Sequence, residues 1–422
     1  MSRTVCALFA LSVFVPAAPT AASEPLTIAQ AIDEALQHNL SLLAERASLT
    51  IADAQMIAAK LRPNPVFSFS ADHLDWLGTG YNAQNNGGPP EIAWRVDVPL
   101  ERGGKRDARV ALASVVRSAA EAQFADAVRT LRQDVTLACI DVMSSRASRD
   151  LLADNLHTFE DLVRVNRARL VAGSIAASEA RRSEVAMLQF RATVVRADLD
   201  LAAANAKLRS LLGRPPGDEI AIADDLRGAA PAEGLEVSGL RRLAIESRPD
   251  LRALQLGQTR STADLRLQEA LGRVDYTVGA EYRRQQGIAG TGNSVGLFFS
   301  APLPFSNRNQ GEIARATAEL TQTDRQIAAR EAQIAADVES AFHEFATNRD
   351  LVASIEADLI GSATRARDTA EYTYRAGGGT LLELLDAQRA FNDTMQSYVD
   401  AQASLRRAAT RLNGAVGTEV IP

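Results

Sequence analysis

Two carboxylates, Glu383 and Asp386, follow a run of three glycines at residues 377–379. Side chains three positions apart lie on one face of an α-helix, so the two acids would point the same way. Where several copies of a helix surround a pore, such a pair forms a ring of carboxylates that favours cations and repels itself. The ordinary alternative is a pair of solvated surface acids. Glu383 and Asp386 are therefore candidates for cation selection at a constriction.

The other reactive side chains show no pattern typical of catalysis. Asp72, His73 and Asp75 form the one cluster that resembles a set of metal ligands. The sequence has no His-x-x-x-His or Cys-His spacing, no nucleophile elbow and no phosphate loop. The histidines are scattered along the chain: His38, His73, His157 and His343. We predict that the protein is not an enzyme and has no metal site and no cofactor.

The candidate acids belong to a pattern that occurs twice in the chain. In the first copy, residues 97–105 end a stretch in which apolar residues alternate with polar ones. A segment without Gly or Pro then extends from Lys105 to Ala172. In the second copy, residues 300–308 have the same place, and the run from Glu312 to Ala376 is interrupted only by Gly361. A tandem repeat of this length indicates a duplicated fold unit rather than two unrelated domains.

The N-terminus has the features of a secretory signal. Arg3 precedes an apolar segment from Val5 to Val15, and small residues follow, so residues 1–22 are expected to be a signal peptide. Cys6 lies inside the apolar segment and is not placed to carry a lipid anchor. Cys139 is then the only cysteine of the mature chain, which excludes an intrachain disulfide, and we expect it to be packed and inert.

The two copies set the expected domain boundaries. We expect the first repeat at residues 23–220, with strands at about 65–75 and 91–100 and a helical hairpin at 105–212. We expect the second repeat at residues 221–422, with strands at about 274–284 and 294–303 and a helical hairpin at 312–413. No linker rich in Pro, Gly and Ser separates the repeats, which favours one interlocked structure.

Each repeat contains two segments in which apolar and polar residues alternate. In one of them, Trp94, Val96 and Val98 alternate with Arg95 and Asp97. This pattern is typical of strands that cross an outer membrane, apolar toward lipid and polar toward a lumen. A half-buried strand of a soluble sandwich has the same local pattern. Because a closed barrel needs about 8 strands, four strands per chain would have to be pooled between copies, and three copies would supply about 12.

The long runs are rich in Ala, Leu, Arg, Glu and Gln, which is typical of helices longer than a single globular core. Their apolar residues form a thin stripe with coiled-coil spacing, and a four-residue step between Ile334 and Val338 resembles a stutter. Gly173 and Gly377 are expected to reverse the chain and close a helical hairpin in each repeat. The net charge of −6, with Arg spread along the helices, does not indicate nucleic-acid binding.

The signal peptide, the duplicated unit and the paired glycine turns together resemble the TolC-type outer membrane efflux family, over essentially the whole mature chain. The sharpest motif is Tyr374–Gln388, which resembles the tip turn of that family followed by its acidic helix. Two further stretches, Pro99–Arg106 and Arg169–Gly173, are most similar to the subgroup that serves heavy-metal efflux pumps of the cobalt-zinc-cadmium type.

The resemblance implies a mainly α fold with a β-barrel part. Three identical chains would form a 12-stranded outer membrane β-barrel that continues into a periplasmic α-helical barrel. The implied partners are a periplasmic adaptor (membrane fusion) protein, an inner-membrane RND pump and outer membrane lipid. The implied function is the exit duct of a tripartite system that exports heavy-metal cations. Alternatives are a duct for drug efflux or type I protein secretion and, from another class, a soluble periplasmic coiled-coil scaffold.

The resemblance also implies site residues at the hairpin tips: Glu383, Asp386 and Tyr374 for a periplasmic constriction, and Gly173 and Gly377 for the turns on which an adaptor docks. Where the family often has a basic residue that helps to close the tip, this chain has Gly379. The sequence leaves open whether Arg375 replaces that residue.

Overall fold

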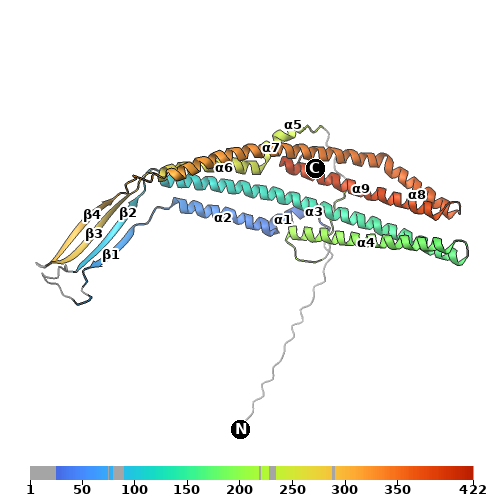
Figure 1. Cartoon of the computed structure of the whole chain (residues 1–422), viewed down its shortest axis with the longest axis horizontal. Helices are drawn as coiled ribbons and strands as arrows, with labels where there is room; N and C mark the ends of the chain where they lie inside the picture. Colours follow the sequence, from blue (N-terminus) through green and yellow to red (C-terminus); the bar gives the residue numbers. More distant parts are fainter. Residues whose placement is uncertain are drawn as a thin grey trace, which may run out of the picture.

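The computed structural model describes residues 25–74, 76–78, 90–217, 220–227, 234–287 and 290–421. The molecule is elongated, with a sheet at one end and the turns of two helical hairpins at the other (Figure 1). The expected signal peptide at residues 1–22 and the possible ligand Asp75 lie outside the described residues. Within the described ranges, none of the helices has both the length and the hydropathy needed to cross a membrane.

Each half of the chain supplies two shorter helices, two strands, a long helix and a returning helix. The first half contains α1 (Ile28–His38), α2 (Leu40–Lys60), β1 (Val66–Asp72), β2 (Glu91–Leu100), α3 (Lys105–Val171) and α4 (Ala177–Leu212). The second half contains α5 (Val237–Ser247), α6 (Pro249–Leu271), β3 (Tyr276–Gly287), β4 (Gly290–Ser300), α7 (Gln310–Ser354), a π-helix (Ile355–Leu359), α8 (Ile360–Arg375) and α9 (Leu381–Val416). This order confirms the predicted fold class of a duplicated, mainly helical unit.

The strand ends differ from the expected ranges. β1 stops at Asp72, after which His73 has a left-handed backbone with φ of 57°. β3 and β4 remain paired as far as Gly287 and Gly290, so most of the loop expected between residues 284 and 294 is strand. Ladder hydrogen bonds join backbone groups and do not require apolar side chains. Alternation of side chains therefore could not indicate this end of the hairpin.

The four strands form one antiparallel sheet in the order β1-β2-β3-β4, in which β2 and β3 join the two repeats. Phe69, Trp94, Tyr282 and Val295 are neighbours across the strands on one face. This apolar face is exposed in the single chain, and Val295 exposes 76% of its surface. The opposite face carries the ion pairs Arg95–Asp97, Arg283–Glu281 and Arg283–Glu91. The sheet thus has the two-faced character that the alternation predicts.

A cluster of charged residues joins the sheet to the helices. Between β2 and α3, Gly103 and Gly104 have φ of 77° and 74°, a backbone conformation that glycine adopts without strain and that turns the chain sharply. The buried Lys105 donates through Nζ to Asp275, just before β3, at 2.7 Å. The glycine- and lysine-containing motif of the first repeat therefore forms a structural joint to the second repeat.

Two equivalent cores lie where the long helices pass the shorter ones. The first packs α1, α3 and α4 around Val135 and Leu212, and the second packs α5, α6, α7 and α9 around Leu412. Cys139 lies in the first core, where burial raises the pKa of its thiol to about 12, with a smaller contribution from the charge of Asp224. The thiol is therefore not ionised at neutral pH and is unreactive.

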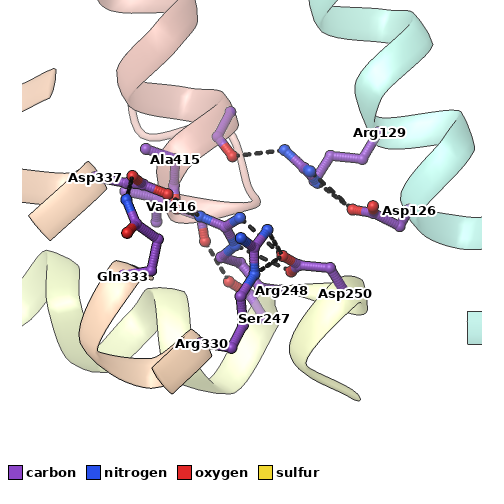
Figure 2. A network of polar contacts seen from close by, with 11 residues as sticks. Asp126, Arg129, Ser247, Arg248, Asp250, Arg330, Gln333, Asp337, Ala415 and Val416 are labelled. Carbon is purple, nitrogen blue, oxygen red and sulfur yellow. Dashed lines mark hydrogen bonds and ion pairs between the residues drawn. The ribbon is translucent and has the colours of Figure 1, made fainter. Parts of the chain in front are cut away.

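Side chains from α3 and from the junction of α5 and α6 cap the C-terminal end of α9 (Figure 2). Three side chains donate hydrogen bonds to the last carbonyl groups of α9. Arg129 Nη1 donates to Gly414 O at 2.8 Å, Arg248 Nη1 donates to Ala415 O at 3.1 Å, and Ser247 Oγ donates to Val416 O at 2.7 Å. Carbonyl groups at a helix C-terminus lack partners within the helix and carry partial negative charge, so two guanidinium groups stabilise this end. α9 is thereby anchored to α3 and to the junction of α5 and α6.

Asp250 is the shared acceptor of this network. Its carboxylate accepts two hydrogen bonds from Arg248, at 3.0 and 2.8 Å, and is also paired with Arg330 of α7. The Arg248 side chain is only 4% exposed. Burial alone would raise the pKa of Asp250, but the hydrogen bonds from Arg248 and Arg330 outweigh burial and hold the pKa well below its usual range. Asp250 therefore stays ionised between two arginines.

The long helix of the second repeat contains an interruption, whereas the long helix of the first repeat is continuous. α7 passes the expected step between Ile334 and Val338 without a break. The irregularity lies further along, at the π-helix Ile355–Leu359, whereas α3 is α-helical from end to end. The two hairpins are thus not equivalent, although their sequences match in length.

Candidate functional site

The candidate site lies at the tips of the two hairpins, far from the sheet (Figure 1). Gly173 and Gly377 have φ of 71° and 80° at the ends of α3 and α8. The amide of Ser174 donates to the carbonyl of Arg169 at 2.8 Å, and the amide of Gly378 donates to the carbonyl of Thr373 at 2.9 Å. These bonds satisfy carbonyl groups at the helix ends in the same way in both turns. A Cβ atom added at either positive-φ glycine would meet only open space.

Tyr374, near the end of α8, ties the second hairpin to the first. Its hydroxyl donates to Asn166 Oδ1 at 2.7 Å and to Glu179 Oε1 at 3.2 Å, and Arg169 lies over its ring with 5.3 Å to the centroid. Burial, followed by the nearby charge of Glu179, raises the pKa of the Tyr374 phenol. The phenol therefore stays protonated at neutral pH, and its single hydrogen is shared between the two acceptors.

Apolar side chains support this contact. Phe159 and Phe190 stack with ring centroids 4.3 Å apart, and they pack with Tyr374, Leu384 and Leu385 in one cluster. A groove of about 560 Å³ along this cluster is lined by residues of α3, α8 and the start of α9. The tip of each hairpin is therefore packed against the other within one chain.

Glu383 and Asp386 both lie on the exposed first turns of α9. The carboxylate of Glu383 accepts a hydrogen bond from the amide of Thr380 at 2.9 Å, and the Thr380 hydroxyl accepts one from the amide of Glu383 at 3.3 Å. This reciprocal pair is a capping box, which sequence reasoning missed although Thr380 and Glu383 have its spacing. Asp386 has a side chain that is 61% exposed and lies 3.9 Å from Arg389.

The two residues considered for closing the tip have different surroundings. Arg375 is paired with Glu371 one turn earlier, at 2.5 Å, and its carbonyl accepts a hydrogen bond from Arg169 at 3.3 Å. A Cβ atom at Gly379 would lie 3.3 Å from both the Thr373 side chain and the backbone of Tyr374. A larger residue at this position would have to displace its neighbours, which gives glycine a steric advantage.

Three further residues complete the site, and sequence reasoning did not recognise them as a set: Asn166, Arg169 and Glu179. Asn166 is fully buried and lies 208 positions from Tyr374. It continues the buried stripe of Phe159 and Val163, where an apolar residue is expected. A polar residue at such a position usually has a buried partner, and this is the signal that could have indicated Asn166. Across the ranges that the structure describes, His, Cys, Asp and Glu side chains do not gather into a group able to hold a metal ion.

The chain has the fold of solved membrane channels. It superposes on the structure of CusC with a TM-score of 0.76 over 96% of both chains, at 16% sequence identity. The CusC structures were solved to follow folding and the formation of a transmembrane channel. The sequence profile of the outer membrane efflux proteins matches residues 31–214 and 240–418. The chain therefore belongs to the outer membrane efflux protein family, which confirms the resemblance seen in its motifs.

Two curated relatives cover most of the chain. The cobalt-zinc-cadmium resistance protein CzcC of Cupriavidus metallidurans is 22% identical over 96% of this chain and 93% of its own length. The pyoverdine export outer membrane protein OpmQ of Pseudomonas putida is 26% identical over 90% of this chain and 83% of its own length.

Proposed function

We propose that the protein is the outer membrane exit duct of a tripartite efflux system that exports heavy-metal cations. The observation that carries this proposal is the sheet of four strands with one uncovered apolar face, at the end of long helices. One of these helices, α3, has 67 residues and is about 100 Å long. The choice of heavy-metal cations is supported by the similarity to CzcC over nearly the whole chain.

Three copies of the chain assemble in this proposal. The apolar faces of their sheets contact outer membrane lipid, and the charged faces line a water-filled lumen. The helical hairpins extend into the periplasm, where the turns at Gly173 and Gly377 dock on an adaptor protein that is bound to an inner-membrane RND pump. Residues 1–22 direct export as a signal peptide and are removed, without a lipid anchor.

The constriction of the proposed duct lies at the tips. Tyr374 holds the second hairpin against Asn166 and Glu179 of the first. Glu383 and Asp386, on the exposed start of α9, supply the carboxylates that favour cations. Since Arg375 is paired with Glu371 in its own helix, we assign the closing contact to Tyr374 rather than to Arg375.

Export of an organic molecule is a second candidate function, favoured by the similarity to the pyoverdine exporter OpmQ. The two candidates can be separated in a strain that lacks its own duct but keeps the adaptor and pump. If the first function is right, the chain restores tolerance to zinc, cobalt or cadmium. Restored export of pyoverdine without restored metal tolerance would support the second.

Assembly gives the most direct test of the proposal. We expect the mature chain to require detergent for extraction and to have the mass of three chains when light scattering is measured with the detergent subtracted. The physical reason is that the exposed apolar sheet face needs lipid or detergent, while four strands leave two open edges that must pair with other copies. A monomer that is soluble without detergent would contradict both the trimer and the duct.

The tip turns give a second prediction. Replacing Gly377 by valine forces a β-branched residue to φ of about 80°, which costs about 1–2 kcal/mol per residue. We expect loss of adaptor binding in a pull-down and weaker efflux, with the trimer intact, because the open space around the turn prevents wider damage. Gly377→Asn, which tolerates positive φ, should retain most binding.

A matched control is Gly311→Val, because Gly311 also has open space around its Cβ position but has an ordinary φ. If Gly377→Val and Gly311→Val bind the adaptor equally well, the turn does not take part in docking. If the trimer is lost together with efflux, the turn has a structural role alone.

A further inference from the structure

The π-helix Ile355–Leu359 breaks the symmetry of the two repeats. When Gly377 is aligned with Gly173, these five residues match Leu151–Asn155 of α3, and Ala357-Asp358 matches Ala153-Asp154. α3 continues through the matching residues as a regular α-helix. The two segments share two of five residues but differ in backbone conformation, so the other residues and their contacts must account for the difference.

A π-turn is a weak point in a long helix. Its hydrogen bonds run from residue i to i+5, so it holds one residue more than an α-helical turn and is easily bent. Figure 1 shows that the helix changes direction where α7 passes into α8. Gly361, just beyond the π-turn, further lowers the local helix propensity. The structure thus places an easily deformed segment between the anchored part of the hairpin and its tip.

The π-turn contacts Tyr398 of α9 through a hydrogen bond and through an apolar cluster that includes Ile355. Tyr398 of α9 is 7% exposed, and its hydroxyl donates to Glu356 Oε1 at 2.6 Å. Burial, followed by the hydrogen bond to Glu356, raises the pKa of the Tyr398 phenol, so it remains a donor at neutral pH. The matching positions of the first hairpin are Leu152 and Val194, whose side chains cannot form such a bond. The contact is therefore specific to the hairpin that contains the π-turn.

The ends of the second hairpin are held separately. Its tip is tied to the first hairpin by the Tyr374 hydroxyl, which donates to Asn166 and Glu179. Its other end is fixed by the side chains that cap the C-terminus of α9. If the tip contact is released, α8 can move about the π-turn, and the unbroken α9 follows by gentle bending.

We propose that the π-turn Ile355–Leu359 is the hinge of the tip constriction, and that Tyr398 and Glu356 are positioning residues that hold the hinge in its closed shape. This inference rests on the proposed duct function and deepens it. Neither residue lies at the tip itself. Both act by setting the direction of α8, which carries Tyr374.

The test measures single-channel conductance of the full-length trimer in planar bilayers. Tyr374→Phe releases the tip contact and should raise the fraction of time spent in the high-conductance state. Tyr398→Phe removes a hydrogen bond to a charged acceptor and should raise that fraction by up to about tenfold. Tyr372→Phe is the matched control, because Tyr372 lies on α8 with 76% of its surface exposed, and it should conduct like the wild type.

Deletion of Ala357 tests the hinge itself. Removing one residue converts a π-turn into a regular α-helical turn and keeps the flanking helices in phase. The deletion should leave the trimer intact and abolish the gain in conductance caused by Tyr374→Phe when the two changes are combined. Deletion of Ala153 in α3 rotates all later residues of a regular helix by about 100° and should disrupt the first hairpin.

The outcomes separate the two proposals. If Tyr374→Phe opens the channel equally with and without Ala357, the hinge is wrong and the duct function stands. If the wild type and Tyr374→Phe both form no ion-conducting pores, the duct function fails and the hinge fails with it. Should the Ala357 deletion prevent folding, Tyr398→Phe remains decisive, since a conductance equal to that of Tyr372→Phe would overturn the positioning role.

Discussion

Replacing Asp250 by asparagine is expected to lower the free energy of unfolding by about 3 kcal/mol, the lower end of the cost of breaking a buried ion pair. The change leaves Arg248, whose side chain is 4% exposed, without the full charge of its main partner. It also removes the ion pair between Asp250 and Arg330, and so loosens α6 from α7. We expect a fall of several degrees in the melting temperature of the detergent-solubilised trimer, measured by circular dichroism.

The effect should depend on pH in a defined direction. The pKa of Asp250 is lowered in the folded protein, so its ionised form contributes stability above the ordinary carboxyl pKa of about 3.9 and this contribution is lost as pH falls further. The difference in melting temperature between the wild type and Asp250→Asn should therefore be full at neutral pH and shrink below about pH 4. A difference that stays constant at lower pH would contradict the role of the charge.

The control for Asp250→Asn is Asp350→Asn in α7. Asp350 pairs with Arg349, but the two side chains are 71% and 46% exposed. Exposed pairs of this kind contribute less than about 1 kcal/mol, so we expect little change in melting temperature. Equal losses in the two variants would mean that burial of the Arg248 network does not strengthen the fold.

Much of the architecture could be predicted because it depends on periodic patterns. The alternation in β2 places Trp94 and Arg95 on opposite faces, and the sheet has these residues on its apolar and charged faces. The positions of Gly173 and Gly377 predict the hairpin turns, since a reversal after a long helix needs positive φ. Such features are local, and each can be deduced from a few neighbouring residues.

The contacts at the tips could not be predicted in the same way. The partner of Tyr374 lies 208 positions away, and no local pattern states which hairpin it faces. The π-turn was also missed, because residues 355–359, like the matching residues 151–155, are compatible with an α-helix. The π-turn contacts Tyr398, a residue of the returning helix, through Glu356. Where a local sequence allows two conformations, tertiary contacts decide between them.

Removing the charges of Glu383 and Asp386 should abolish the cation preference of the duct. The carboxylate of Glu383 also caps α9, so alanine at this position would change both charge and helix stability. Glu383→Gln keeps the capping box, because glutamine serves at the same position, and Asp386→Asn is nearly isosteric. A unit charge 4 Å from a passing cation contributes about 1 kcal/mol in bulk water, so the loss of several charges should reduce the cation-to-anion permeability ratio by about tenfold or more.

The permeability ratio of the double variant, Glu383→Gln with Asp386→Asn, is obtained in planar bilayers from the reversal potential in a salt gradient. Block of the current by added zinc should weaken in parallel. Asp368→Asn is the control, since it removes an exposed acid from α8 without altering the start of α9. Selectivity is a better measure than conductance, because the Tyr374 contact can keep the tip closed in all variants. If the double variant and Asp368→Asn have the same permeability ratio as the wild type, Glu383 and Asp386 face away from the lumen and act only as surface acids and as a helix cap.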